Sequence, residues 1–160
     1  MSDTICMDDV ARHAEATVLY DEAYAFVRST VGAFRRGPRV IFCSTETCFR
    51  SFGFDRAVAQ AVGVSGIVLG PRGWKDYYLR HEMIHHLQAE HLGVIRQWLM
   101  PGWFTEGMAY AFSQDPRPVL ADPWQEYRAA FESWYQVVGK DDLWVEARAL
   151  RPRLARVLGR

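Results

Sequence analysis

Apolar residues at helical spacing run through the first part of the chain. Val10, Ala14 and Val18 recur every four residues within a proline-free segment of about residues 8–34, a pattern typical of an amphipathic helix. A Gly-Pro dipeptide then ends the pattern. An N-terminal helix is therefore predicted within residues 1–36.

Two short apolar runs predict a small sheet in residues 39–70. Arg39 to Cys43 and Gly66 to Leu69 contain β-branched residues and are bounded by glycine and proline. A polar stretch, residues 44–47, follows the first run, and the ambiguous segment 49–62 could contain a short helix at residues 55–61.

Three further helices are predicted in the second half. One begins near Asp76, a favourable N-cap residue, and runs to about His91, with a glycine two residues later as its stop. The next spans about residues 104–113. The last occupies residues 122–139, with proline at its first helical position. Its core-facing stripe is predicted to comprise Trp124, Tyr127, Phe131, Trp134 and Val138.

These elements predict one α+β domain, since 160 residues lie within the usual size of a single domain. Its successive parts would be an N-terminal helix (1–36), a sheet region (39–70), a helix pair (76–114), a C-terminal helix (122–139) and an Arg-rich tail (140–160). Arg148, Arg151, Arg153, Arg156 and Arg160 of the tail are best explained by a solvated amphipathic helix.

Composition and charge narrow the function classes. The 19 basic and 19 acidic side chains cancel, so the chain lacks the positive excess that binding of nucleic-acid phosphates requires. No apolar run approaches the roughly 20 residues of a membrane span, and the first residues do not resemble a secretory signal. We expect no nucleic-acid partner, no membrane span and a cytoplasmic location.

The three cysteines are Cys6, Cys43 and Cys48. Cys43 and Cys48 flank a short polar stretch and could bridge in an oxidising compartment. Free thiols in a reducing cytosol are the favoured interpretation.

The segment His81-Glu82-Met83-Ile84-His85 carries the clearest chemistry of the sequence. Residues four apart lie on the same helical face, so His81 and His85 can point their ring nitrogens at one metal ion. Glu82 is rotated about 100° away and can take a proton from a metal-bound water without being a ligand. The adjacent His86 is expected to pack or to bond elsewhere, and His91 to be solvated.

A catalytic zinc ion needs a third protein ligand. Glu106 is the best candidate, since a helix–loop–helix hairpin can return its carboxylate to the histidine face. Glycine inside a helix costs roughly 0.5–1 kcal/mol. Gly107 is therefore predicted to let the second helix pack tightly against the first.

His81-Glu82-x-x-His85 followed by Trp103-x-x-Glu106-Gly107-x-Ala109 resembles the two-helix signature of the gluzincin metallopeptidases, zincins whose third zinc ligand is glutamate. The match covers about residues 66–114. The short chain resembles the minimal single-domain members, called minigluzincins or peptidase MA-like proteins.

The resemblance implies a zincin-like fold and peptide-bond hydrolysis at Zn²⁺, held by His81, His85 and Glu106 with Glu82 as the general base. It also implies that Gly66, Ile67, Val68 and Leu69 form an edge strand above the metal that binds a peptide or protein substrate.

Gluzincins usually supply a tyrosine or histidine that stabilises the oxyanion. Tyr110, one helical turn after Glu106, is the leading candidate for a site-lining group. The chain departs here from the thermolysin-like subgroup, which carries an acidic residue at this point. Tyr127 and Tyr135 are interpreted as core aromatics, and Trp103 as packing the hairpin.

Other functions remain open. The chain could be a regulatory protein that cleaves one partner, a non-catalytic zinc-binding module, or a protein whose Arg-rich tail binds an acidic partner. The tail or the first helix could also cover the cleft and keep the enzyme latent.

Overall fold

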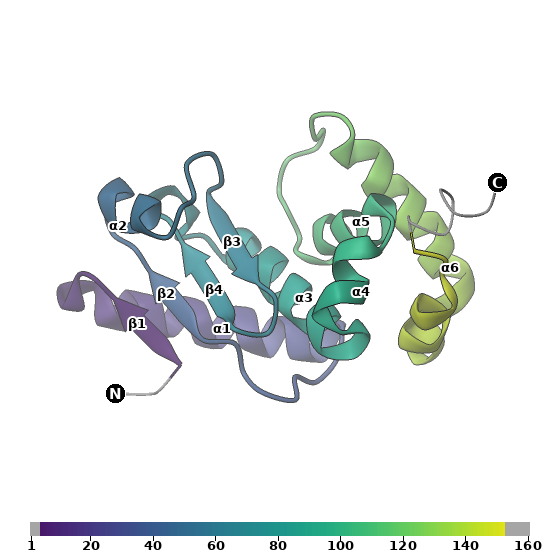
Figure 1. Cartoon of the computed structure of the whole chain (residues 1–160), viewed down its shortest axis with the longest axis horizontal. Helices are drawn as coiled ribbons and strands as arrows, with labels where there is room; N and C mark the ends of the chain where they lie inside the picture. Colours follow the sequence, from purple (N-terminus) through teal and green to yellow (C-terminus); the bar gives the residue numbers. More distant parts are fainter. Residues whose placement is uncertain (1–3, 153–160) are drawn as a thin grey trace.

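Four short strands form one mixed sheet in the computed structural model of the protein, which describes residues 4–152. The sheet has the order β1-β2-β4-β3 (Figure 1). The strands are β1 (Ile5–Met7), β2 (Val40–Phe42), β3 (Ala59–Val62) and β4 (Gly66–Leu69). The first three in spatial order are parallel, and β3 runs antiparallel to β4. Both predicted strands are present, within an α+β domain.

The position of β4 corrects the sequence-based prediction. Because β4 lies between β2 and β3, Gly66, Ile67, Val68 and Leu69 do not form an edge strand. The edge strand on this side of the sheet is β3, which begins within residues 55–61, the stretch for which the sequence suggested a short helix. Its Ala-Gln-Ala-Val sequence has little intrinsic strand preference, and pairing with β4 decides its conformation.

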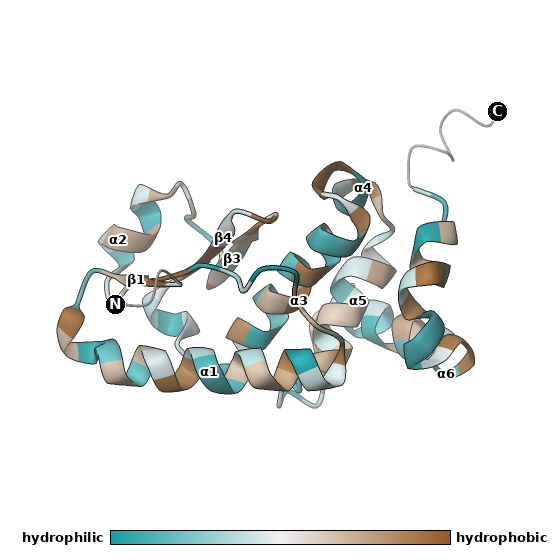
Figure 2. Ribbon diagram, turned by 90° about the horizontal axis from the view of Figure 1, so that it is seen from below, coloured by the Kyte–Doolittle hydropathy of each residue, from teal (hydrophilic) through white to brown (hydrophobic). Residues whose placement is uncertain are grey.

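Helices cover both faces of the sheet. They are α1 (His13–Thr30), α2 (Glu46–Ser51), α3 (Asp76–Leu92), α4 (Val94–Leu99), α5 (Gly102–Phe112) and α6 (Trp124–Ala149). α1 lies beneath the sheet and contacts α3, while α2 lies on the opposite side (Figures 1 and 2). Within residues 4–152, none of the helices combines the length and the hydropathy that crossing a membrane requires.

Three helices, α1, α2 and α4, differ from the predictions. The N-terminal helix begins only at His13, because residues 5–7 pair with β2 and residues 10–12 form a 3₁₀ turn capped by Asp9. Neither α4 nor α2 was predicted, and α2 begins within the polar stretch 44–47.

The core forms where α3 meets the sheet. Leu79, Met83 and Leu87 recur every four residues along this helix, a spacing that predicts one core face, and all three are fully buried. Successive side chains of β4 point to opposite faces of the sheet. Ile67 and Leu69 therefore enter the same core, whereas Val68 packs against α2 on the other face.

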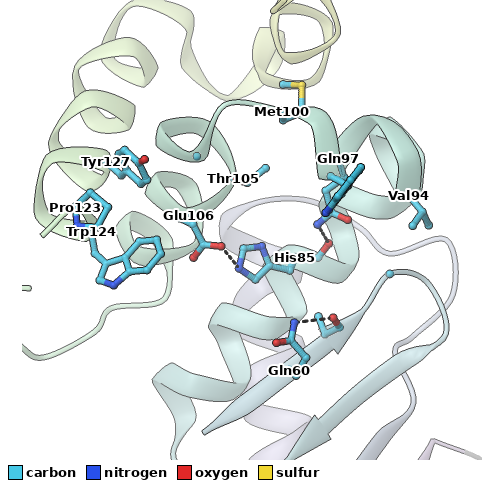
Figure 3. A pocket seen from close by; sticks show the side chains of 14 residues that line it. Gln60, His85, Val94, Gln97, Met100, Thr105, Glu106, Pro123, Trp124 and Tyr127 are labelled. Atoms are coloured by element: carbon cyan, nitrogen blue, oxygen red, sulfur yellow. Dashed lines mark hydrogen bonds and ion pairs between the residues drawn. The ribbon is translucent and has the colours of Figure 1, made fainter. Parts of the chain in front are cut away.

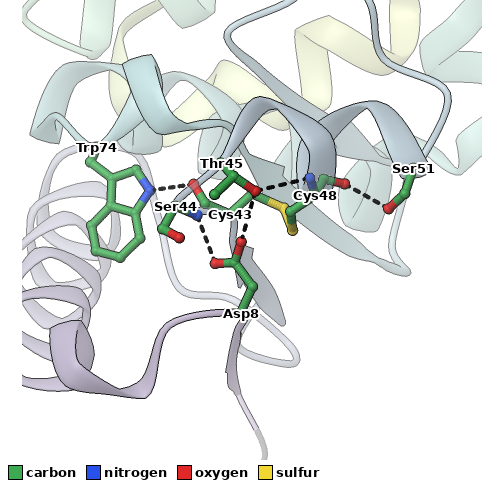
Figure 4. Close-up of a disulfide and its surroundings, with 7 residues drawn as sticks. All are labelled: Asp8, Cys43, Ser44, Thr45, Cys48, Ser51 and Trp74. Carbon is green, nitrogen blue, oxygen red and sulfur yellow. Dashed lines mark hydrogen bonds between the residues drawn. A yellow bond between two sulfur atoms is a disulfide. The ribbon is translucent and has the colours of Figure 1, made fainter.

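A disulfide joins Cys43, which follows β2, to Cys48 in α2 (Figure 4). Thr45 caps α2 by accepting the backbone N–H of Cys48, and Asp8 accepts a hydrogen bond from Thr45. The prediction of free thiols is therefore wrong for this pair, while Cys6 is free and exposed. Disulfides persist mainly in oxidising compartments, so the cysteines do not support the predicted cytoplasmic location.

The end of α6 returns to the body of the protein. Gly139, with φ 73° and ψ 178°, interrupts the helix where its end was predicted. The helix then continues, with Leu143 and Ala147 fully buried and Trp144 stacked on His91 at 4.0 Å between ring centroids. Residues 140–149 thus form an amphipathic helix, and Arg148 is exposed on it as predicted. His91, in contrast, is half-buried against Trp144 and not solvated as expected. The last three tail arginines, Arg153, Arg156 and Arg160, lie outside the described residues.

Gly107 brings α5 and α6 into close contact. A Cβ atom there would lie 2.3 Å from the Tyr127 carbonyl oxygen and 2.8 Å from Phe131 Cβ. The sequence correctly indicated a close approach at this glycine, but the partner is α6 and not the histidine helix. Trp103 supports the same junction by edge contact with Trp134.

Replacing this glycine tests the close approach. Gly107→Ala should destabilise the protein by about 2–4 kcal/mol, because its methyl group would overlap the α6 backbone. At a helical glycine without such a neighbour, replacement by alanine would instead increase the stability of the protein by about 0.5–1 kcal/mol. Urea unfolding of this variant, with exposed Ser133→Ala as a control, measures the difference. A Gly107→Ala variant as stable as wild type would contradict the packing.

Candidate metal centre

Two helices bring three potential metal ligands together. His81 and His85 lie one turn apart on α3, and Glu106 lies near the start of α5. The two Nε2 atoms are 3.1 Å apart, and each is 3.5 Å from one oxygen of the Glu106 carboxylate. The side chains remain partly accessible to water, with exposed fractions of 12% for His81, 13% for His85 and 30% for Glu106.

These separations suit a tetrahedral ion. Bonds of about 2.0–2.1 Å in tetrahedral geometry separate ligand atoms by about 3.3–3.4 Å. The separations found here, 3.1 Å between the two histidine nitrogens and 3.5 Å from each of them to a carboxylate oxygen, are close to that requirement. The residues singled out from the sequence therefore form a group that could hold a metal ion.

The carboxylate controls the charge of this group. Burial would lower the pKa of His85, but the hydrogen bond and charge of Glu106 raise it to about 9. Burial would likewise raise the pKa of Glu106, yet its contacts with both imidazoles hold that pKa far below its usual range. A cation entering the group must therefore displace the proton of His85, which couples metal binding to pH.

Gln88 orients His85 and joins the two helices. Its Oε1 atom lies 3.0 Å from His85 Nδ1, and its Nε2 atom donates to the carbonyl of Thr105, the residue before Glu106. The side chain is fully buried. Because Oε1 can only accept, the proton of neutral His85 stays on Nδ1 and its Nε2 is free to bind a metal. Sequence reasoning missed this residue, although it lies three positions beyond His85.

Glu82 is held beside the ligands by the edge strand. One carboxylate oxygen, Oε2, accepts the backbone N–H of Ala61 in β3 at 2.6 Å. The other, Oε1, has no hydrogen-bond partner among residues 4–152. The carboxylate is nearly buried, with 9% exposure for the residue, and it lines the same cavity as His81. One oxygen is thus anchored and the other remains available to a proton.

Tyr110 lies against the first histidine. Its ring meets that of His81 edge-on at 4.5 Å between centroids. Burial and the charge of Glu106 raise the pKa of its hydroxyl, so the hydroxyl is protonated at neutral pH and able to donate. Tyr110 lines the site as expected, and its catalytic role stays a prediction.

Two cavities of different character meet at the ligands. One, of about 420 Å³, is polar and includes Tyr77, Tyr78, Asp115 and Arg117 together with His81 and Glu82. The other, of about 590 Å³, opens between α4 and the start of α6 (Figure 3). We call it the aromatic cavity. Its lining is Gln60, Ala61, Gly63, His85, Val94, Gln97, Trp98, Met100, Gly102, Thr105, Glu106, Pro123, Trp124 and Tyr127.

Several side chains have a different place from the one predicted. Trp124 and Tyr127 line the aromatic cavity (Figure 3) and are not simply core aromatics. Tyr135 does belong to the core, where it stacks on Phe131. His86 packs away from the ligands, 3.6 Å from Glu90, in agreement with its prediction.

Asp115 and Arg117 were also missed by sequence reasoning. The Asp115 side chain is 3% exposed and pairs with the guanidinium of Arg117, whose charge lowers the pKa of that buried carboxyl despite the opposing effect of burial. Their Asp-Pro-Arg segment indicated only a turn, so no sequence signal marked them as cavity residues.

Comparisons of the chain with protein-family models, with curated proteins and with solved structures give no match.

The charge of the metal-free site should appear in the pH dependence of stability. Since folding raises the pKa of His85 from 6.5 to about 9, its stabilising contribution is complete below about pH 6.5 and disappears as the pH rises through about 9. In EDTA, the unfolding free energy of wild type should fall by up to roughly 3 kcal/mol over this range. Glu106→Gln should show a much smaller fall. Parallel pH profiles for the two proteins would contradict the ion pair.

The role of Gln88 can be tested with Co²⁺ as a spectroscopic probe. Gln88→Leu should weaken Co²⁺ binding about 10–100-fold, because His85 loses the acceptor that orients it. Gln136→Leu, on the exposed side of α6, controls for the substitution itself. Circular dichroism separates this effect from unfolding. Unchanged affinity and an unchanged cobalt spectrum in a folded Gln88→Leu variant would remove Gln88 from the site.

Proposed function

We propose that the protein is a zinc-dependent peptidase of the gluzincin type. The observation that carries the proposal is the triad of His81, His85 and Glu106, whose donor atoms are spaced for a tetrahedral ion. Three protein ligands leave a fourth position open, which is the arrangement of catalytic rather than structural zinc sites. A ligand helix packed on a small sheet beside its edge strand is consistent with the zincin-like plan that the sequence resembles.

Zinc bound by these residues would polarise a carbonyl group and lower the pKa of a coordinated water. Glu82 is the group of this chain that can move the proton. Its Oε1 atom would accept a proton from water and later deliver it to the leaving amine, while Ala61 holds Oε2 in place. A purely structural metal site would have no use for such a base.

An extended peptide is the substrate that the surroundings of the triad favour. Along β3, the backbone N–H and C=O groups of successive residues point alternately toward β4 and toward the outer edge of the sheet. The carbonyl of Val58 accepts the N–H of Gly70 beside β4, whereas the N–H of Ala61 points outward and donates to Glu82. Ala59 therefore turns its backbone groups to the outer side of the sheet. Peptides commonly bind by adding a strand to such an edge. The role once assigned to Gly66–Leu69 thus passes to β3.

The hypothesis of a latent enzyme has no support among the described residues. Within residues 4–152, neither α1 nor the segment after Tyr127 lines either cavity at the triad. The following experiment distinguishes the proposed peptidase from a non-catalytic zinc module and from an enzyme for one specific partner.

Zinc content and peptide cleavage should be measured together on wild type, Glu82→Gln and Glu106→Ala. Wild type and Glu82→Gln should each bind about one zinc ion per chain, and Glu106→Ala should bind far less. Cleavage of a mixed peptide library should fall about 10²–10⁴-fold in Glu82→Gln, since a general base typically contributes that much.

Glu132→Gln, exposed on α6, is the matched control and should behave as wild type. Stoichiometric zinc without cleavage of any peptide or candidate protein would contradict the peptidase proposal and favour a binding module. No zinc uptake by wild type would remove the metal site altogether.

A further inference from the structure

The aromatic cavity is bordered by apolar side chains that water reaches. Trp98 of α4 is 81% exposed and Val94, one turn earlier, is 48% exposed. Both line the cavity, and Trp124 and Tyr127 of α6 line it as well. Exposed apolar surface concentrated around a cavity is unfavourable in water and typically marks a binding site.

α4 is held firmly although its apolar side chains are exposed. Gln97 donates to the carbonyl of His85 at 2.8 Å, and Arg96 donates to the carbonyl of Leu150 at 3.0 Å. The turn after β3 also touches the helix, since a Cβ atom at Gly63 would lie 3.0 Å from a methyl carbon of Val94. Trp98 is thus presented by an anchored helix, so little backbone freedom would be lost when a ligand covers it.

The cavity reaches the metal ligands from one side only. His85 and Glu106 belong to its lining, and so does Ala61 of the edge strand (Figure 3 shows the two ligands beside Trp124). A residue of a peptide bound along β3 could therefore place its side chain here while its carbonyl lies at the triad. The cavity on the other side also has aromatic walls but contains the ion pair of Asp115 and Arg117, so the two ends of the cleft differ in charge.

We infer that the aromatic cavity is a specificity subsite for a large apolar or aromatic side chain of the peptide substrate, next to the bond that is cleaved. This inference rests on the proposed peptidase function. Trp98 and Val94 determine the selectivity, and α4 is the element that carries it. The occupant is a peptide with Phe, Leu or a similar residue at one position beside the scissile bond.

The inference predicts a selective effect of Trp98→Ala. The sites at which wild type cleaves a peptide library first identify the substrate position that selects an apolar residue. Two quenched fluorescent peptides that differ only at this position, one with Phe and one with Ala, are then compared. The preference is the kcat/KM for the Phe peptide divided by that for the Ala peptide. Wild type should prefer the Phe peptide, and Trp98→Ala should lower this ratio about 10–100-fold. Trp98→Phe should restore most of it.

Ile95→Ala provides the matched control. Ile95 is 77% exposed on the same helix but does not line the cavity, so its replacement should leave the preference unchanged. Cleavage that shows no preference for apolar residues, or a preference equally sensitive to Ile95→Ala and Trp98→Ala, would overturn the inference and leave the peptidase proposal intact.

Binding without turnover separates the two proposals. Zinc-loaded Glu82→Gln should bind the Phe peptide more tightly than the Ala peptide by fluorescence anisotropy, and Trp98→Ala should abolish the difference. If the variants bind the peptides as expected but wild type cleaves neither peptide, the aromatic cavity is a binding site for apolar side chains and the peptidase proposal is wrong. If the protein instead forms a dimer that Trp98→Ala dissociates, and binds neither peptide, the surface is a contact between two copies and the inference is wrong.

Discussion

One buried amide sets the relation between the two helices of the metal centre. Gln88 bonds to His85 on its own helix and to the carbonyl of Thr105 on α5, and leaving either bond unmade inside the protein would be costly. The position of α5 then brings Glu106 to the histidines. It also brings the bare backbone of Gly107 against α6, and the beginning of α6 supplies one wall of the cleft.

The edge strand serves the site in two ways. Through the N–H of Ala61 it holds one oxygen of Glu82 and leaves the other available, and its outer side borders the cleft on which both cavities open. A shift of β3 would therefore disturb the base and the peptide-binding edge together. The disulfide between Cys43 and Cys48 braces α2 on the opposite face of the sheet, away from this chemistry.

The sequence by itself determined the candidate metal centre and the core face of its helix. His81, Glu82 and His85 are related by local helical geometry, which depends only on their spacing. The burial of Leu79 and Met83 follows from the same periodicity. Glu106 could be proposed because a short hairpin brings neighbouring helices together, and the α+β class because breakers bound the two apolar runs.

Only the tertiary structure decided the order of the strands and the walls of the cleft. Residues 59–62 form the edge strand through pairing with β4, which their own preferences do not favour. Trp98 and Trp124 come to face one cavity from two helices that are distant in sequence, and the close partner of Gly107 lies on α6. These relations depend on contacts between residues far apart in the chain, which the periodicity of a local segment does not encode.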